Sequence, residues 1–143
     1  MPKFQFKYDS IKRIKGLLEK KIQKEISLLD LEIVWNDSEC SKLISEKKNN
    51  LKNRKNNKVA ELKAVENYNK SLDKKIEIIQ KQIVNLKKKK EEKLNELIEK
   101  SKEHKIFQTL EDTHLENFKY NENLKDESNI NEIATQKFIR DKS

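Results

Sequence analysis

The residues of this sequence that could bind a metal ion or catalyse a reaction are few and widely spaced. His104 and His114 are the only histidines, and Cys40 is the only cysteine. On one helix, ten residues place the two histidines about 80° apart around the axis and roughly 15 Å apart along it, so they cannot share a metal ion. We therefore expect His104 and His114 to be polar residues in a helical seam and Cys40 to be a small apolar one.

The composition also lacks the signs of a catalytic pocket. One Gly and one Pro cannot supply a glycine-rich phosphate loop or the turns of a sheet. The 25 acidic residues are explained by a solvated helix surface, and their pattern implies no concave site. We predict that the protein is not an enzyme and has no catalytic residue, metal site, cofactor or small-molecule substrate.

One long apolar period between residues 58 and 118 organises the chain. Side chains recur at steps of three and four, which is typical of a coiled-coil helix with about 3.5 residues per turn. The seam contains Leu62, Val65, Leu72, Ile76, Ile79, Ile83, Leu86, Leu97, Phe107 and Phe118, with Lys90, Lys93, His104 and His114 at its polar positions. A helix of about 60 residues with so narrow a seam must bury it against a second helix.

That second helix is predicted from about residue 5 to about residue 50. Residues 3–9 are expected to lead into it, and Asp9 and Ser10 can cap it just before Ile11. Its seam is expected to contain Ile11, Leu18, Ile22, Ile26, Leu29, Ile33, Cys40 and Leu43, with an irregular step around Ile22. Further apolar residues lie beside this seam: Ile14, Leu17, Leu28, Leu31, Val34, Trp35 and Ile44. This stripe is wider than a two-stranded coil requires, so it indicates either additional helices or a partner protein.

The asparagine-rich residues 51–57 are predicted to form the apex of a hairpin. The sequence thus predicts an all-α, antiparallel two-helix coiled-coil hairpin in a single unit, with helix 2 longer than helix 1. An apex near residue 54 predicts facing residues whose numbers add to about 109, so that Ile33 lies near Ile76. Residues 106–118 should then overhang, followed by a loosened C-terminal segment at 119–143. Because the overhang is apolar, self-association or binding to another protein is expected there.

The net charge of +8 indicates nucleic acid or an anionic surface as one class of partner. However, the 25 acidic residues are interspersed with the 33 basic ones, and no aromatic residues accompany the basic runs, so we expect no nucleic-acid groove. A single cysteine, an N-terminus without an apolar core and the lack of a long apolar stretch predict a soluble, cytoplasmic protein.

Four short stretches of the sequence each contain a distinctive motif. Residues 4–9 alternate aromatic and polar residues before a leucine-rich helix, residues 68–76 read aromatic-xxx-Leu-acidic-xx-Ile, and residues 108–112 read Gln-Thr-Leu-Glu-Asp. A C-terminal motif is formed by Asn131, Glu132, Ile133, Ala134, Thr135 and Phe138. Together they resemble the FliJ family, small coiled-coil components of the flagellar type III export apparatus. The C-terminal motif is close to the family's Asp-Glu-Ile-Ala-Thr-x-x-Phe, with Asn131 in place of the acid.

This resemblance implies a stalk-like protein that binds the export ATPase hexamer with its helix termini and binds the cytoplasmic domain of the export gate. It also implies escort of export chaperones, and a location at the cytoplasmic face of the inner membrane, peripheral to it, at the flagellar base. Gate-binding positions implied by the resemblance are Tyr68, Leu72, Lys75 and Ile79, of which Lys75 and Ile79 depart from some family members. Contacts with the ATPase ring are expected from Phe4, Phe6, Ile106, Phe107, Leu110, Leu115 and Phe118.

Two other readings remain open at this point. One is the equivalent stalk protein of a virulence injectisome, and the C-terminal motif favours the flagellar version over it. The other is a basic coiled-coil scaffold or nucleic-acid-associated protein, which only the net charge supports.

Overall fold

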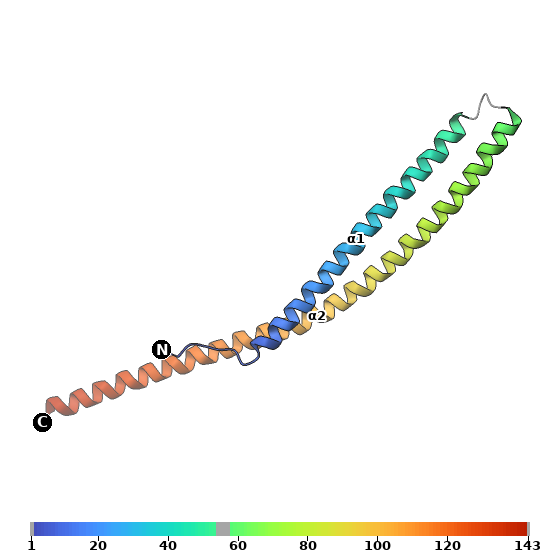
Figure 1. Ribbon diagram of the computed structural model, residues 1–143. Coiled ribbons are helices and arrows are strands. Elements are labelled where there is room, and N and C mark those ends of the chain that lie inside the picture. Colours follow the sequence, from blue (N-terminus) through green and yellow to red (C-terminus); the bar gives the residue numbers. More distant parts are fainter. Residues whose placement is uncertain (1, 54–57, 143) are drawn as a thin grey trace. The chain divides into compact units, whose positions relative to one another are not determined.

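The computed structural model describes residues 2–53 and 58–142. They form two helices, α1 (Asp9–Lys52) and α2 (Val59–Lys142), which pack against each other in opposite directions (Figure 1). The predicted all-α hairpin with a longer second helix is confirmed. Residues 54–57 of the predicted apex lie outside the described residues.

The chain falls into two compact units, which are described separately. Unit 1 comprises Met1–Glu19 and Glu99–Ser143, and unit 2 comprises Lys20–Ile98. In unit 2 the core is a line of buried side chains: Ile22, Ile26, Ile33 and Cys40 from α1 and Asn69, Leu72 and Ile83 from α2. Complete burial of one such aliphatic side chain contributes about 1.5–3 kcal/mol, so a seam of this kind stabilises the helix pair along its length.

The seam predicted for α2 in unit 2 is confirmed. Leu72 and Ile83 are buried, and Ile76, Ile79 and Leu86 are half-buried. At the two lysine positions of the seam the ammonium groups form ion pairs across the hairpin. Lys90 lies 2.6 Å from Asp30, and Lys93 lies 2.8 Å from Glu25. Charged side chains of both signs therefore occupy seam positions where the apolar period weakens.

The register of the hairpin differs from the prediction. Lys47 pairs with Asp73, and Asp30 pairs with Lys90, so that facing residue numbers add to 120 rather than about 109. The predicted pairing of Ile33 with Ile76 is therefore wrong. The same offset is seen at the end of α1, where Asn50 donates a hydrogen bond to Asn69, which lies well inside α2. The first two turns of α2 thus extend past the end of α1.

Both helix boundaries at the free ends of the chain also differ from the prediction. α1 begins at Asp9, one of the two predicted capping residues, rather than near residue 5, and Asp9 N donates a hydrogen bond to Phe6 O. α2 does not end near residue 118 but continues to Lys142, so the predicted loosened segment at 119–143 is wrong up to that residue. Its Asn and Ser residues each cost less than about 0.7 kcal/mol of helix stability, and no Gly or Pro stops propagation.

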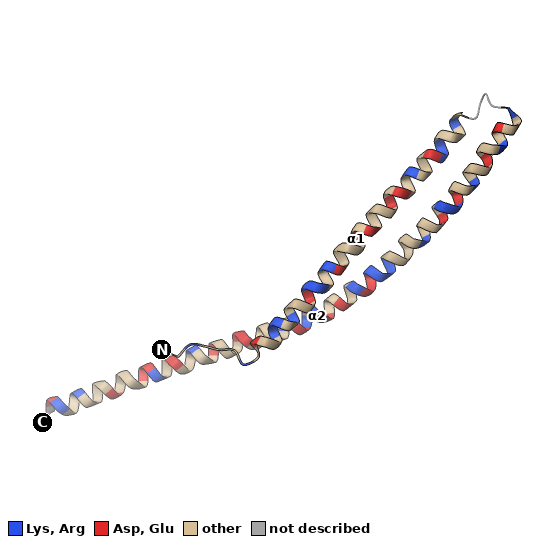
Figure 2. Ribbon diagram, in the orientation of Figure 1, with Lys and Arg blue, Asp and Glu red and all other residues tan. Residues whose placement is uncertain are grey.

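The first turn of α2 is capped by one of its own side chains. The backbone N–H of Lys58 donates to Oε2 of Glu61, three residues on, which is half of a capping box. Lys and Arg are interspersed with Asp and Glu along most of both helices (Figure 2). No helix among the described residues is long and apolar enough to cross a membrane.

Candidate functional site

The two histidines lie in the α2 seam of unit 1, as predicted, and both have structural partners. His104 Nδ1 lies 2.8 Å from Oε2 of Glu19 on α1. Ser101 Oγ donates a 3.0 Å hydrogen bond to the other oxygen of the same carboxylate. His114 packs edge-on against the ring of Phe6, with ring centroids 5.6 Å apart. Each imidazole therefore helps to hold α2 against the N-terminal part of the chain.

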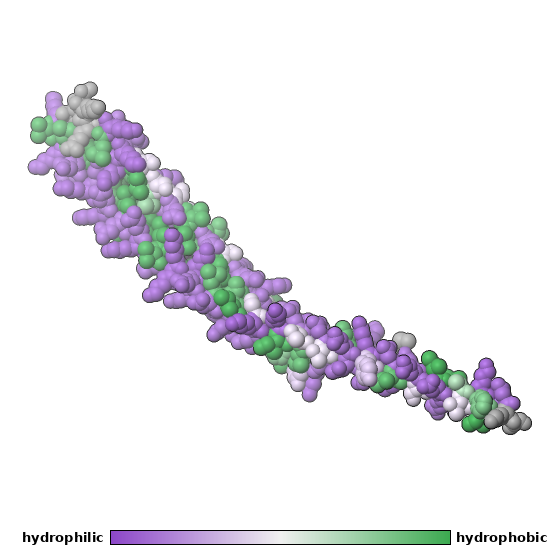
Figure 3. Space-filling view, turned by 180° about the vertical axis from the view of Figure 1, so that it is seen from behind, coloured by the Kyte–Doolittle hydropathy of each residue, from purple (hydrophilic) through white to green (hydrophobic). Residues whose placement is uncertain are grey.

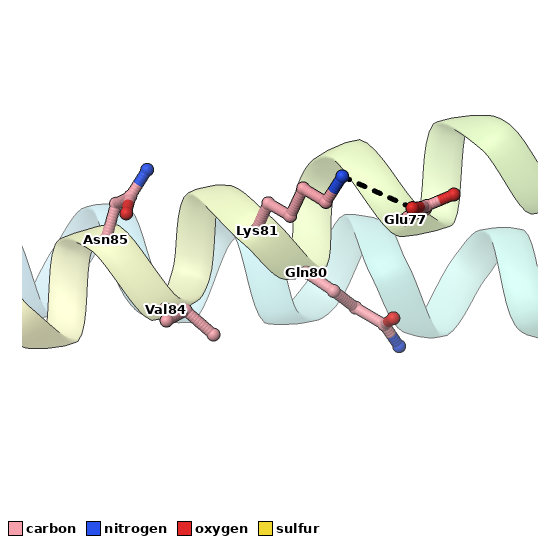
Figure 4. Close-up of a pocket in the computed structure, with 5 residues that line it drawn as sticks. All are labelled: Glu77, Gln80, Lys81, Val84 and Asn85. Carbon is pink, nitrogen blue, oxygen red and sulfur yellow. Dashed lines mark ion pairs between the residues drawn. The ribbon is translucent and has the colours of Figure 1, made fainter.

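Within residues 2–53 and 58–142, no group of three His, Cys, Asp or Glu side chains is placed to hold a metal ion. A shallow depression on α2 in unit 2 is lined by Glu77, Gln80, Lys81, Val84 and Asn85 (Figure 4). Its only charged groups, Lys81 and Glu77, pair with each other at 3.2 Å. This depression presents an ion pair, two amides and an isopropyl group, and it contains neither a nucleophile nor an oriented base.

Polar pairs replace apolar contacts in the α1 seam of unit 1. Lys12 pairs with Glu111, and Lys15 lies 2.9 Å from Glu103. The hydrogen bond to Glu111 raises the pKa of Lys12, and the hydrogen bond from Lys15 lowers the pKa of Glu103. The opposite charge beside each of these two groups thus favours the ammonium form of Lys12 and the carboxylate form of Glu103.

These pairs correct the seam predicted for this part of α1. Ile11 is 42% exposed and Leu18 is 36% exposed, so neither is a core residue. The seam positions are instead Lys12, Lys15 and Glu19, which keep the steps of three and four without an irregular step. The prediction failed because it followed apolar residues, whereas the helix period at this end is carried by charged ones.

An aromatic cluster in unit 1 covers the segment that was predicted to overhang. The non-helical N-terminal residues run along α2, where Phe4 meets Phe118 at 5.5 Å and Tyr8 meets Phe107 at 6.3 Å between ring centroids. Phe6 is 9% exposed. The predicted overhang at 106–118 is therefore wrong. α1 itself reaches Glu111 through Lys12, and the non-helical N-terminal residues cover α2 from there to Phe118.

The part of α2 that neither α1 nor the non-helical N-terminal residues cover begins after Phe118. From residue 119 to residue 141, every side chain is exposed except that of Glu122, which is half-buried. The larger apolar side chains exposed here are Tyr120, Leu124, Ile130, Ile133, Phe138 and Ile139. Figure 3 shows hydrophobic side chains (green) between hydrophilic ones (purple) at this end of α2. We call residues 119–142 the C-terminal helical end; it contains all six positions of the C-terminal motif.

The four predicted gate-binding residues, all in unit 2, differ in their exposure. Tyr68 is 48% exposed, and its hydroxyl donates a hydrogen bond to Glu46, which raises the pKa of Tyr68. Lys75 is exposed and, seven residues on, lies on the same face of α2 as Tyr68. Ile79 is half-buried, and Leu72 is 1% exposed. Leu72 therefore packs in the core and offers almost no surface to a partner.

A family model described as Flagellar FliJ protein matches residues 37–143. The chain belongs to the FliJ family. The matched range includes all of α2 and the last part of α1, so it contains the Tyr68 stretch and the C-terminal motif from which the resemblance was drawn. Members of the FliJ family are non-catalytic coiled-coil components of the flagellar export apparatus. No curated protein and no solved structure matches the chain.

Sequence reasoning missed the polar residues that complete the FliJ-type hairpin here. Glu19, Lys12 and Lys15 were not singled out, although counting back from Ile22 in steps of three and four reaches each of them. Glu46, the partner of Tyr68, had no signal of its own in the sequence, because glutamates are common on a charged helix.

Proposed function

We propose that this chain is the stalk-like subunit of a flagellar export apparatus and binds the export ATPase ring through the C-terminal helical end. One observation carries the proposal: a run of helix from residue 119 onward exposes its apolar side chains and bears the family's C-terminal motif. Large apolar side chains that are exposed on a helix can be buried against another protein.

The residues proposed to contact the ring change accordingly. Of the set expected from the sequence, Ile106 is 63% exposed, whereas Phe4, Phe107, Leu110, Leu115 and Phe118 are half-buried and Phe6 is buried. We assign the packed aromatic residues to stabilising unit 1 and the ring contact to the exposed ones. The proposed contact set is Ile106, Leu124, Ile130, Ile133 and Phe138.

Binding to the cytoplasmic domain of the export gate is proposed at Tyr68 and Lys75, with the exposed part of Ile79. The hydrogen bond from Tyr68 to Glu46 holds the phenol ring in one position on the surface. A fixed aromatic ring loses little conformational freedom on binding, which is why Tyr is frequent among residues that dominate interfaces. Leu72 would act indirectly, by holding the helix pair beneath Tyr68.

The remaining parts of the proposal are inferred from membership of the FliJ family. The protein would escort empty export chaperones and act in the cytoplasm at the inner-membrane face of the flagellar base. Its mechanism would be mechanical and allosteric: the hairpin bridges the ATPase ring and the gate and couples the nucleotide state of one to engagement of the other. None of these steps requires a cofactor or a catalytic residue.

The test is ATP hydrolysis by the cognate export ATPase, measured with and without the full-length chain. We expect stimulation by the chain, and a loss of most of it in a variant with Ile130→Gln and Ile133→Gln, which keeps good helix formers on the helix. A matched control with Lys125→Gln and Lys137→Gln changes the same helical end without removing apolar surface and should stimulate normally. If the Ile variant stimulated as well as the unmodified chain, the assignment of the ring contact to this end would be wrong.

A further inference from the structure

An acidic and apolar face lies on α1 in unit 2. Between Lys24 and Lys42 the chain has no Lys or Arg, which is its longest stretch without a base, although it has 33 such residues in all. Figure 2 shows this part of α1 without blue residues. The same stretch exposes four large apolar side chains: Leu28 (53%), Leu31 (66%), Val34 (65%) and Trp35 (66%).

These side chains lie on the surface of α1 that faces away from the seam. The seam uses Ile26, Ile33 and Cys40, which are buried. Leu28, Leu31 and Trp35 follow at the spacing i, i+3 and i+7, so they line one stripe on the opposite side of the helix. Apolar residues at this spacing are typical of a helix that binds another protein through one face.

Acidic side chains border the stripe on both edges. Asp30 and Asp37 lie on one edge, and Glu25, Glu32 and Glu39 lie on the other, as their positions in the helical period require. Three of the five have ion-pair partners in the hairpin: Glu25 with Lys93, Asp30 with Lys90, and Glu39 with Lys42. Among the described residues, Glu32 and Asp37 form no ion pair, so one uncompensated carboxylate remains on each edge.

We infer that this acidic-apolar face docks an amphipathic helix of a partner protein, with an apolar stripe bordered by Lys or Arg. Its apolar residues would pack on Leu31 and Trp35, and its basic residues would pair with Glu32 and Asp37. An anionic membrane or nucleic acid would be repelled by the acidic edges. Pairing with the same face of a second copy would bring identical acidic edges together, which is unfavourable.

This docking surface is distinct from the proposed gate-binding residues and from the C-terminal helical end. It therefore does not depend on the proposed ATPase contact. Its chemistry also differs from that of the rest of the chain, because a molecule with a net charge of +8 should repel a basic helix elsewhere. Binding of a basic amphipathic helix is thus a selective probe of this face.

The test uses the fluorescence of Trp35, the only Trp in the chain. The probes are two synthetic helical peptides of about 18 residues, or roughly five turns, one of Leu and Lys and one of Leu and Glu. We expect saturable binding of the Leu-Lys peptide with a blue shift of Trp35 emission, and no binding of the Leu-Glu peptide. Glu32→Lys with Asp37→Lys should weaken binding roughly threefold to tenfold, and Leu31→Asp should weaken it at least about tenfold.

A matched control places the same charge changes elsewhere in unit 2. Glu91→Lys with Glu92→Lys alters two exposed acids of α2 and should change the affinity by less than about twofold. Circular dichroism checks that each variant keeps its helices. The inference would be overturned by equal binding of the two peptides, by equal weakening in the control, or by unchanged binding in the Glu32 and Asp37 variant. It would also be overturned if sedimentation showed that Leu31→Asp dissociates a dimer, because the face would then be a contact between copies.

Discussion

Gly16 on α1 lies so close to His104 on α2 that a Cβ at this position would be 3.2 Å from Nε2 of the imidazole. The ring cannot move freely, because its other nitrogen contacts Glu19, which also accepts a hydrogen bond from Ser101. The only glycine of the chain therefore has a packing role rather than a conformational one: it allows the two helices of unit 1 to approach at a histidine.

This relationship predicts that the effect of Gly16→Ala depends on His104. Ala gains about 1 kcal/mol of helix stability over Gly in an exposed helix. In the unmodified chain, we expect this gain to be largely offset by displacement of the imidazole. In a His104→Ala background the gain should appear in full. Urea unfolding of the four variants of this double-mutant cycle measures the difference, and equal effects of Gly16→Ala in both backgrounds would rule out the proposed contact.

Stability should fall in acid because of Glu25 and Glu103. The hydrogen bond from Lys93 lowers the pKa of Glu25, and that from Lys15 lowers the pKa of Glu103, both from the ordinary value of 4.5. A carboxyl group whose pKa is lower in the folded state stabilises the fold above its unfolded pKa, and this contribution is lost as the pH falls through the folded pKa. The loss should therefore begin below about pH 5 and deepen toward about pH 3.

The measurement is urea unfolding between about pH 3 and pH 6. Glu25→Gln with Glu103→Gln should flatten the dependence in this range, whereas Glu91→Gln, an exposed control, should leave it unchanged. A double variant with the same acid loss as the unmodified chain would show that these two pairs do not contribute. In alkaline solution the ion pairs of Lys93 and Lys12 should be lost instead. Their carboxylate partners raise the pKa values of both lysines, so the stability that these pairs add to the fold should be lost above about pH 10.5.

Two truncations should separate the parts of α2 that stabilise the hairpin from the part that does not. Deletion of residues 119–143 removes side chains that are nearly all exposed, so the free energy of unfolding should change by less than about 0.5 kcal/mol. Deletion from residue 106 onward also removes the rings that contact Phe4, Phe6 and Tyr8, and should cost about 2–4 kcal/mol. Urea unfolding followed by circular dichroism tests both values. A large loss in the shorter deletion would contradict the exposed state of the C-terminal helical end.

The α2 seam was predictable residue by residue because apolar side chains carry the coiled-coil period in unit 2. In unit 1 the α1 seam was not, since Lys12, Lys15 and Glu19 hold the period while Ile11 and Leu18 lie beside it. A search for apolar residues identifies the wrong face of a helix where ion-paired residues occupy the seam positions. The family was predictable from short motifs, which are independent of this error.

The predictions of the hairpin register and of the C-terminal end of α2 failed for different reasons. A symmetric apex was assumed near residue 54, but Asn50 contacts Asn69, and nothing in the sequence fixes how far one helix extends past the other. The polar composition after residue 118 suggested an end to α2, yet the helix continues because no breaker residue is present. Leu72 was predicted both as a seam residue and as a gate-binding residue, and its 1% exposure agrees with the first of these predictions.

Site-specific cross-linking from the C-terminal helical end is the most direct test of the proposed function. In a Cys40→Ser background, a single cysteine at Ile133 would carry a benzophenone label, and a cysteine at Ser45 on α1 would serve as the control. We predict that the label at position 133 forms an adduct with the export ATPase in the purified complex and that the label at position 45 does not. A complex that forms but yields no adduct from position 133, or equal adducts from both positions, would contradict the view that this helical end enters the ring.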